Sequence, residues 1–281
     1  MLAFVRWLAR RSLATLHIWG GWLGRVTWLL SPGYRQRFAE NAARAGLSPA
    51  EQGSAIREAG KLAAELPWLW LGEAARPISR HCTWRGEHLI DEALNSGRGL
   101  VLLTPHMGSF EVCAQAYAER WGERWPMTAL YRPSRKAALR ELEETARARP
   151  GLLTAPASLA GVRQMLRALK RAETVGLLPD QVPPAGQGVW APFFGERAYT
   201  MTLATRLARQ TGAALLLMWA ERLPRAGGWV LHVSAPCAPL PAEGDDEADG
   251  AFVNREMERL IRAAPTQYLW GYHRYKAPRS S

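Results

Sequence analysis

Between residues 99 and 235 the chain alternates short, continuously apolar runs with stretches of helical pattern. Such runs are typical of strands that are buried on both faces, and parallel strands require helical crossovers between them. The pattern therefore predicts an α/β fold with a mostly parallel or mixed central sheet flanked by helices. The apolar runs are "GLVLLTP" (99–105), "PMTALYR" (126–132), "TVGLLPD" (174–180), "AALLLMW" (213–219) and "WVLHVSA" (229–235), and the helical stretches are 110–122, 135–149, 158–172 and 200–211.

Local signals refine this pattern at three places. The strict alternation of "WVLHVSA" predicts an edge strand. Ser48 as N-cap and Pro49 at the first helical position predict a helix from residue 49, which Pro67 is expected to interrupt. The acidic run in "PAEGDDEADG" predicts a solvated loop or the start of a helix.

Polar side chains follow three of the predicted strands. His106 comes after the first run, Arg132 ends the second, and Asp180 ends the third. In open α/β sheets the functional crevice lies beyond the carboxyl ends of the strands. We therefore expect a base, a cation and an acid to meet at one edge of the sheet.

The stretch "LLTPHMGSFE" (102–111) places a histidine and a glutamate five positions apart. Five helical positions correspond to about 140° of rotation, so His106 and Glu111 must lie on either side of a turn if they are to meet. Gly108 permits that turn, Ser109 is the expected N-cap, and Glu111 falls in the first helical turn. A carboxylate on one imidazole nitrogen leaves the other as a general base. The alternative is that both residues only stabilise a strand-to-helix corner.

Other candidate motifs are weaker evidence for a function. "HMGSF" lacks the small residue that a nucleophile elbow needs after its serine, so a serine hydrolase is disfavoured. "GQGVWA" (186–191) matches a dinucleotide fingerprint but follows no strand and opens no helix. Arg132 could grip a phosphate, or form an ion pair with Asp180. The aromatic segment "VWAPFFGERAYT" (189–200) could line an acyl channel or be plain core.

The N-terminal segment from Ser12 to Ser31 is about as long as a membrane-spanning helix, and only His17 and Arg25 interrupt it. No convincing cleavage site follows, so we expect an uncleaved membrane anchor over residues 1–32 and a catalytic domain over residues 33–281. The anchor could span the bilayer or lie in its interface, and a core helix is the alternative. An interfacial helix would keep the catalytic domain inside the cell.

The formal net charge of +11 favours anionic partners, such as lipid surfaces, nucleic acid or acidic carrier proteins. The arginines are scattered, which disfavours a nucleic-acid-binding module. The three cysteines, Cys82, Cys113 and Cys237, are far apart and odd in number. They predict a reducing compartment, no disulfide and no zinc site, and we expect neither a metal nor a cofactor.

The chain contains four blocks in the order "HMGSFE", "ALYRPSRK", "LLPDQVPPAGQGVWAPFFG" and "APTQYLWGYHRYK". Together they resemble the bacterial lipid A biosynthesis acyltransferases of the lysophospholipid acyltransferase superfamily. The resemblance implies transfer of an acyl chain from an acyl carrier protein thioester to a hydroxyl of a lipid A precursor, at the cytoplasmic face of the inner membrane.

The resemblance also implies roles for single residues. His106 would deprotonate the acceptor hydroxyl and Glu111 would orient it. Backbone amides near Gly108 and Ser109 would hold the developing oxyanion. Arg132 would anchor a phosphate or sugar acid of this phosphorylated glycolipid, and Asp180 with Gln181 would shape the site.

Two departures from the family pattern concern the acceptor. Val182 stands where an acidic residue follows the Asp-Gln pair in enteric-type members, and Ser134 and Arg135 stand in place of an asparagine. Another acceptor, such as a lysophospholipid, ornithine lipid or glycolipid, is therefore the alternative prediction.

Overall fold

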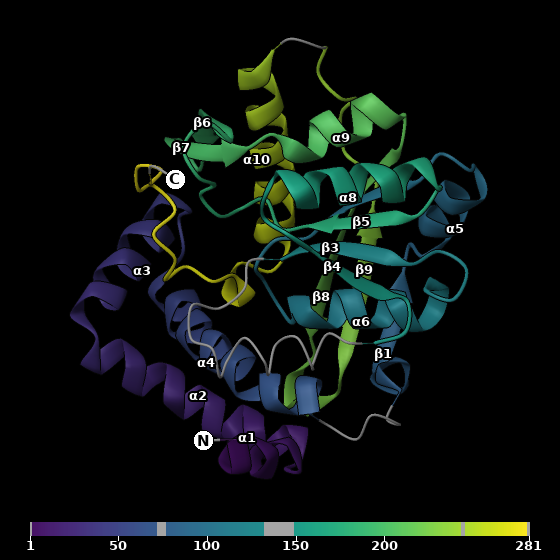
Figure 1. Cartoon of the computed structure of the whole chain (residues 1–281). Coiled ribbons are helices and arrows are strands. Elements are labelled where there is room, and N and C mark those ends of the chain that lie inside the picture. Colours follow the sequence, from purple (N-terminus) through teal and green to yellow (C-terminus); the bar gives the residue numbers. More distant parts are fainter. Residues whose placement is uncertain (1, 72–76, 132–148, 243–244, 280–281) are drawn as a thin grey trace.

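The computed structural model describes residues 2–71, 77–131, 149–242 and 245–279. Its centre is a seven-stranded sheet in the order β1-β9-β8-β2-β5-β3-β4 (Figure 1). All neighbouring strands pair in parallel except β8 and β9, which are antiparallel. The predicted α/β fold with a mixed central sheet is thus confirmed. The strands are β1 (Cys82–Arg85), β2 (Leu100–Leu103), β3 (Met127–Tyr131), β4 (Leu152–Pro156), β5 (Thr174–Leu177), β8 (Ala214–Arg222) and β9 (Trp229–Ser234).

One strand prediction needs correction. β9 is an inner strand, because β1 pairs with it on the side away from β8. The alternation in "WVLHVSA" comes from partial exposure of His232 and Ser234 rather than from an edge position. β1 and β4 were not predicted, because each is short and partly exposed and so lacks a continuous apolar run.

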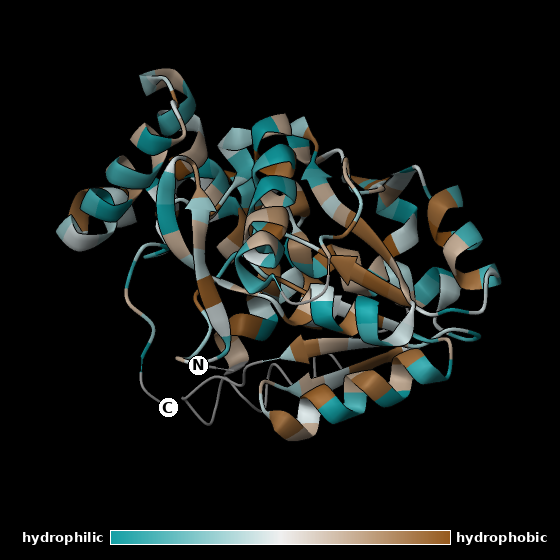
Figure 2. Cartoon of the chain, turned by 90° about the horizontal axis from the view of Figure 1, so that it is seen from above, coloured by the Kyte–Doolittle hydropathy of each residue, from teal (hydrophilic) through white to brown (hydrophobic). Residues whose placement is uncertain are grey.

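Helices cover both faces of the sheet. β2 shows the division, since Leu100 and Leu102 join one apolar cluster while Val101 and Leu103 join the other. The first cluster contains α5 (His88–Asn95) and α6 (Phe110–Trp121), and the second contains α8 (Leu159–Lys170), α9 (Leu203–Thr211) and α10 (Asp246–Ala263). In Figure 2 the central strands are mostly hydrophobic, whereas the helices alternate between hydrophobic and hydrophilic positions.

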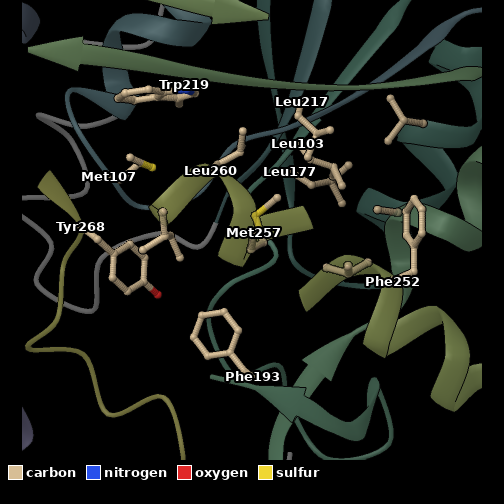
Figure 3. Packing of buried hydrophobic residues seen from close by; sticks show 14 of the residues in the cluster. Leu103, Met107, Leu177, Phe193, Leu217, Trp219, Phe252, Met257, Leu260 and Tyr268 are labelled. Atoms are coloured by element: carbon tan, nitrogen blue, oxygen red, sulfur yellow. The ribbon is translucent and has the colours of Figure 1, made fainter. Parts of the chain in front are cut away.

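Helix α10 supplies much of the packing on the second face. Met257 and Leu260 are buried against strand residues such as Leu103 and Leu217 (Figure 3). Asp245 caps the helix by accepting a hydrogen bond from the Ala248 amide at 2.8 Å. The acidic run is therefore a helix start, one of its two predicted forms.

A two-stranded hairpin follows β5 and packs near α10. It consists of β6 (Gly188–Phe193) and β7 (Glu196–Met201), and it contains the aromatic segment that was expected to be core or channel. Phe193 is buried in the main core, while Trp190 on the same strand is exposed. The segment thus contributes to the core through alternate residues.

Four helices precede the sheet and lie together on one side of the molecule (Figure 1). They are α1 (Leu2–Ala9), α2 (Leu13–Leu30), α3 (Pro32–Arg44) and α4 (Pro49–Leu71). α4 begins where predicted, and the Ser48 hydroxyl and the Glu51 carboxylate cap it reciprocally. It continues through Pro67, contrary to prediction, and buries Trp68 and Leu69 in its last turn.

Helix α2 matches the predicted anchor segment and packs closely on α4. A Cβ atom placed on Gly24 would lie 2.1 Å from the Ile56 carbonyl oxygen, and one on Gly60 would lie 2.0 Å from the Gly20 carbonyl oxygen. Only glycine allows backbones to approach so closely. No helix in the described part of the chain is both long enough and apolar enough to cross a membrane. Of the forms considered for the anchor, the spanning helix is thus not found there.

Candidate active site

The ends of β2 and β5 meet at one edge of the sheet. These strands are parallel neighbours in the register Leu103 to Leu177, and the Thr104 amide extends the pairing to the Leu177 carbonyl. β3 pairs with the other side of β5. The predicted meeting of strand ends is thus present for His106 and Asp180, whereas Arg132 lies outside the described residues.

His106 and Asp180 make two hydrogen bonds. The ring Nδ1 of His106 lies 2.7 Å from Oδ1 of Asp180, and the backbone amide of His106 donates to Oδ2 at 2.9 Å. Asp180 is almost fully buried, with 1% of its side chain exposed, while His106 keeps 17%. One carboxylate therefore fixes both the backbone and the ring of the histidine.

Asp180 is ionised in this setting. Burial alone would raise its pKa, but the nearby His106 ring, its two N–H donors and the Arg274 guanidinium hold the pKa below the usual value. An ionised carboxylate only accepts hydrogen bonds, so Nδ1 of His106 carries a proton. In the neutral ring, Nε2 then has the lone pair that a general base requires.

The C-terminal segment after α10 supports this pair. Burial raises the pKa of Tyr268 well above its usual value, and the charge of Asp180 raises it further. Tyr268 lies near Met107 (Figure 3), and the two form an isolated β-bridge. The Leu269 amide donates to the His106 carbonyl at 3.2 Å. Arg274 is itself buried and held by the Tyr199 carbonyl and the Thr200 hydroxyl.

Glu111 lies in the first turn of α6, as predicted. Its carboxylate accepts a hydrogen bond from the Trp70 indole at 3.3 Å, and both Glu111 and His106 line one cavity. Among the contacts between described residues, the carboxylate on the His106 ring is that of Asp180. The expected pairing of Glu111 with His106, and any role of Glu111 in the reaction, stay predictions.

Gly108 and Ser109 form the turn between His106 and helix α6. Gly108 has a φ of +56°, and a Cβ atom there would lie 1.9 Å from the Ala220 carbonyl oxygen. The Gly108 amide donates to the Gln267 carbonyl and the Ser109 amide donates to the Ala220 carbonyl. Both amides already have acceptors, so in this conformation they do not serve a substrate oxyanion.

Ser109 stands at the N-cap position of α6, but its hydroxyl does not cap the helix. It donates instead to Oε1 of Glu65 at 2.7 Å, inside the protein. Ser109 is fully buried and contributes to the support of the site rather than to its lining.

A cavity of about 660 Å³ opens beside His106. This volume lies within the range of ~300–1,000 Å³ that is usual for small-ligand sites. Most of its wall is apolar, and its polar lining includes His106, Glu111 and Gln181. The apolar lining includes Ala129, Leu130, Val162, Leu178, Met201 and Leu207.

Metal ligands are not grouped in the described part of the chain, where no cluster of three or more His, Cys, Asp or Glu side chains could hold an ion. The three cysteines are free thiols.

The sequence reasoning missed three residues that hold the site. Glu65 binds the Ser109 hydroxyl in the His106 turn, Tyr268 forms a β-bridge with Met107, and the buried Arg274 charge acts on Asp180. The two C-terminal residues lie in the block "APTQYLWGYHRYK", which contributed to the family resemblance but did not indicate a contact with the His106 turn. Glu65 lies in an ordinary helical pattern and gave no signal.

A general base beside an apolar cavity suits transfer of an acyl chain to a hydroxyl. The sequence profile of the bacterial lipid A biosynthesis acyltransferases matches residues 53–277. The chain belongs to this family and is an acyltransferase of lipid A synthesis.

Individual relatives show moderate similarity. The chain is 29% identical over 219 residues to the lipid A biosynthesis lauroyltransferase of Escherichia coli, which covers 77% of this chain and 68% of the relative. It is 28% identical over 228 residues to the lipid A biosynthesis palmitoleoyltransferase of the same organism, covering 80% and 68%. A lipid A biosynthesis acyltransferase of Haemophilus influenzae is 26% identical over 204 residues, covering 71% and 62%.

Proposed function

We propose that this enzyme transfers a fatty acyl chain from an acyl carrier protein thioester to a hydroxyl of a phosphorylated lipid A precursor. The observation that carries the proposal is the His106–Asp180 pair on the wall of a largely apolar cavity. His106 is the general base, with Asp180 as its orienting carboxylate.

The reaction follows from the protonation state of the pair. Nε2 of His106 takes the proton of the acceptor hydroxyl as its oxygen attacks the thioester carbonyl carbon. Asp180 stabilises the imidazolium that forms, because its charge lies 2.7 Å from Nδ1. The C–S bond of the tetrahedral intermediate then breaks, and the imidazolium returns the proton to the departing thiolate. The products are the ester and the free thiol of the carrier.

The acyl chain occupies the cavity. Its wall of Leu130, Val162, Leu178 and Leu207 offers an apolar surface, and His106 lies where the carbonyl end would sit. Gln181 and Glu111 line the same space and are among the polar groups that could contact the acceptor or the thioester. Arg132 keeps its proposed role of binding a phosphate of the acceptor.

We further propose that the enzyme works at the cytoplasmic face of the inner membrane. Helices α1 and α2 present a set of large, exposed apolar side chains on the side away from α4, and arginines stack on tryptophans at Arg11–Trp7 and Arg25–Trp22. This pattern fits a helix that lies in the lipid interface, with residues 33–281 as the catalytic domain. The exposed residues are Phe4, Trp7, Ile18, Trp19, Trp22, Leu23, Val26, Leu29 and Leu30.

Mass spectrometry of lipids from a strain that lacks the gene tests the proposed acceptor. We expect lipid A to lose one secondary acyl chain and to regain it when the wild-type gene, but not His106→Ala, is returned. Unchanged lipid A with an altered phospholipid or aminolipid pool would instead support another acceptor.

A further inference from the structure

A buried ionic cluster lies behind the His106 turn, outside the cavity. Its centre is Glu65 on α4, which is fully buried, and Arg222 at the end of β8, with 1% of its side chain exposed. Arg222 binds both oxygens of Glu65, at 2.5 Å and 3.0 Å. The remaining guanidinium nitrogen, Nη1, donates a hydrogen bond to Glu58 at 2.9 Å. The proposed chemistry uses none of these groups.

The cluster holds the turn that carries His106. Arg222 Nη2 donates to the Gly108 carbonyl at 2.9 Å, and the Ser109 hydroxyl donates to Glu65 at 2.7 Å. Gln267 also supports the turn. Its side-chain amide makes two hydrogen bonds to the backbone of Arg222, and its backbone carbonyl accepts a hydrogen bond from the Gly108 amide. The turn is thus fixed from β8, α4 and the C-terminal segment at once.

The same carboxylate also contacts the N-terminal helix. His17 on α2 lies with Nε2 3.1 Å from Oε2 of Glu65, and its side chain is only 7% exposed. A single carboxylate therefore lies between α2 and Ser109, three residues from the proposed base. Although burial acts to raise the pKa of Glu65, the Arg222 charge holds it below the usual value, so the group is ionised.

We propose that Glu65 and Arg222 are positioning residues for the His106 turn, and that His17 couples the docking of α2 on α4 to that turn. The inference rests on the proposed role of His106 as the base. Because the opposite side of α2 carries the exposed apolar residues, the helix that contacts lipid is also the helix that holds the catalytic turn in place. Removing one partner of a buried charge strongly destabilises a protein. Loss of the His17 contact to Glu65 should therefore weaken the support of the His106 turn.

Hydrogen–deuterium exchange of the purified full chain tests the coupling without reference to activity. The Gly108 and Ser109 amides are hydrogen-bonded in the closed turn, so their exchange reports its opening. We expect His17→Leu, which removes the bond to Glu65, to speed exchange over residues 106–112 about tenfold, given the strength of hydrogen bonds to charged groups. Exchange over the hairpin at 188–201 should not change.

Two control variants define the link. His17→Gln retains an N–H donor and should restore slow exchange at the turn. Thr27→Ala changes an exposed position of the same helix and should resemble the wild type. An unchanged rate over residues 106–112 in His17→Leu, or an equal rise over the turn and the hairpin, would overturn the proposal.

Ser109→Ala tests the coupling between α2 and the His106 turn from the side of the turn. It provides the test if His17→Leu does not fold. Coupling is reciprocal, so exchange around His17 on α2 should accelerate in this variant. Unchanged exchange of α2 would contradict the coupling. In a transfer assay, His17→Leu should lower kcat about tenfold while KM for both substrates stays within twofold, and His17→Gln should recover kcat. Absence of transfer by the wild type would count against the proposed function. The exchange rates would still test the coupling between α2 and the His106 turn.

Discussion

Nδ1 of His106 lies 2.7 Å from Oδ1 of Asp180, although the two residues are 74 positions apart in the chain. The parallel pairing of β2 with β5 brings them together, because each follows the carboxyl end of its strand. The imidazole is therefore held by a carboxylate from the neighbouring strand, while Glu111 lies on the cavity side.

Nitrogen NMR of the His106 ring should distinguish the two carboxylates. Asp180 accepts from both the ring and the backbone N–H of His106, and an asparagine there would offer only one acceptor oxygen. We expect Asp180→Asn to weaken or remove the protonated Nδ1 signal, whereas Glu111→Gln should leave it in place. Loss of that signal in Glu111→Gln alone would return the orienting role to Glu111.

The stability of the protein in acid should reveal the charge on Asp180. Its folded pKa lies below the ordinary value of 3.8, so the ionised group stabilises the fold fully above that value. This contribution is lost as the pH falls through the folded pKa. Urea unfolding should therefore show a difference between wild type and Asp180→Asn that is constant from about pH 5 to 7 and shrinks below about pH 4. A difference that grows on acidification would contradict the assignment.

Gly108→Ala should be strongly destabilising. Its φ of +56° is unfavourable for alanine, and the added Cβ would meet the Ala220 carbonyl at 1.9 Å. Gly212 is a matched control, because it has a φ of +71° with no atom within 4 Å of its Cβ position. We expect Gly212→Ala to cost about 1–2 kcal/mol and Gly108→Ala clearly more, measured by denaturant unfolding. Equal costs would mean that the close approach to β8 relaxes freely.

The exposed tryptophans of α2 should contribute to lipid binding. Trp19 and Trp22 are 42% and 61% exposed beside other apolar residues. The double variant Trp19→Ser/Trp22→Ser should bind anionic vesicles at least ~10-fold more weakly, because burial of an aromatic side chain in the interface is lost. Trp190→Ser, at an exposed tryptophan of the hairpin, should bind as the wild type does. An equal loss of vesicle affinity in the two variants would contradict a specific role of α2 in lipid binding.

Much of the fold could be predicted from local pattern. Continuous apolar runs identified β2, β3, β5 and β8, and the residues that follow them led to His106 and Asp180. β1 and β4 were not predicted, because a strand of four or five partly exposed residues shows little hydrophobic periodicity. Pro67 does not end α4, since burial of Trp68 and Leu69 outweighs the lost hydrogen bond.

The pairing within the site was harder to predict. Sequence spacing favoured Glu111 as the partner of His106, because the two are close in the chain. The choice of Asp180 depends on which strands are neighbours, and strand order is a property of the whole sheet. The buried Glu65 was unpredictable for the same reason, since its partners His17, Ser109 and Arg222 come from three distant parts of the chain.

The most direct test of the central claim is a transfer assay with purified protein, a labelled acyl carrier protein thioester and a phosphorylated lipid A precursor. His106→Ala and Asp180→Asn should each lower kcat by at least ~100-fold, the usual contribution of a general base, with the fold retained by circular dichroism. Transfer by His106→Ala at a rate close to that of the wild type would contradict the account.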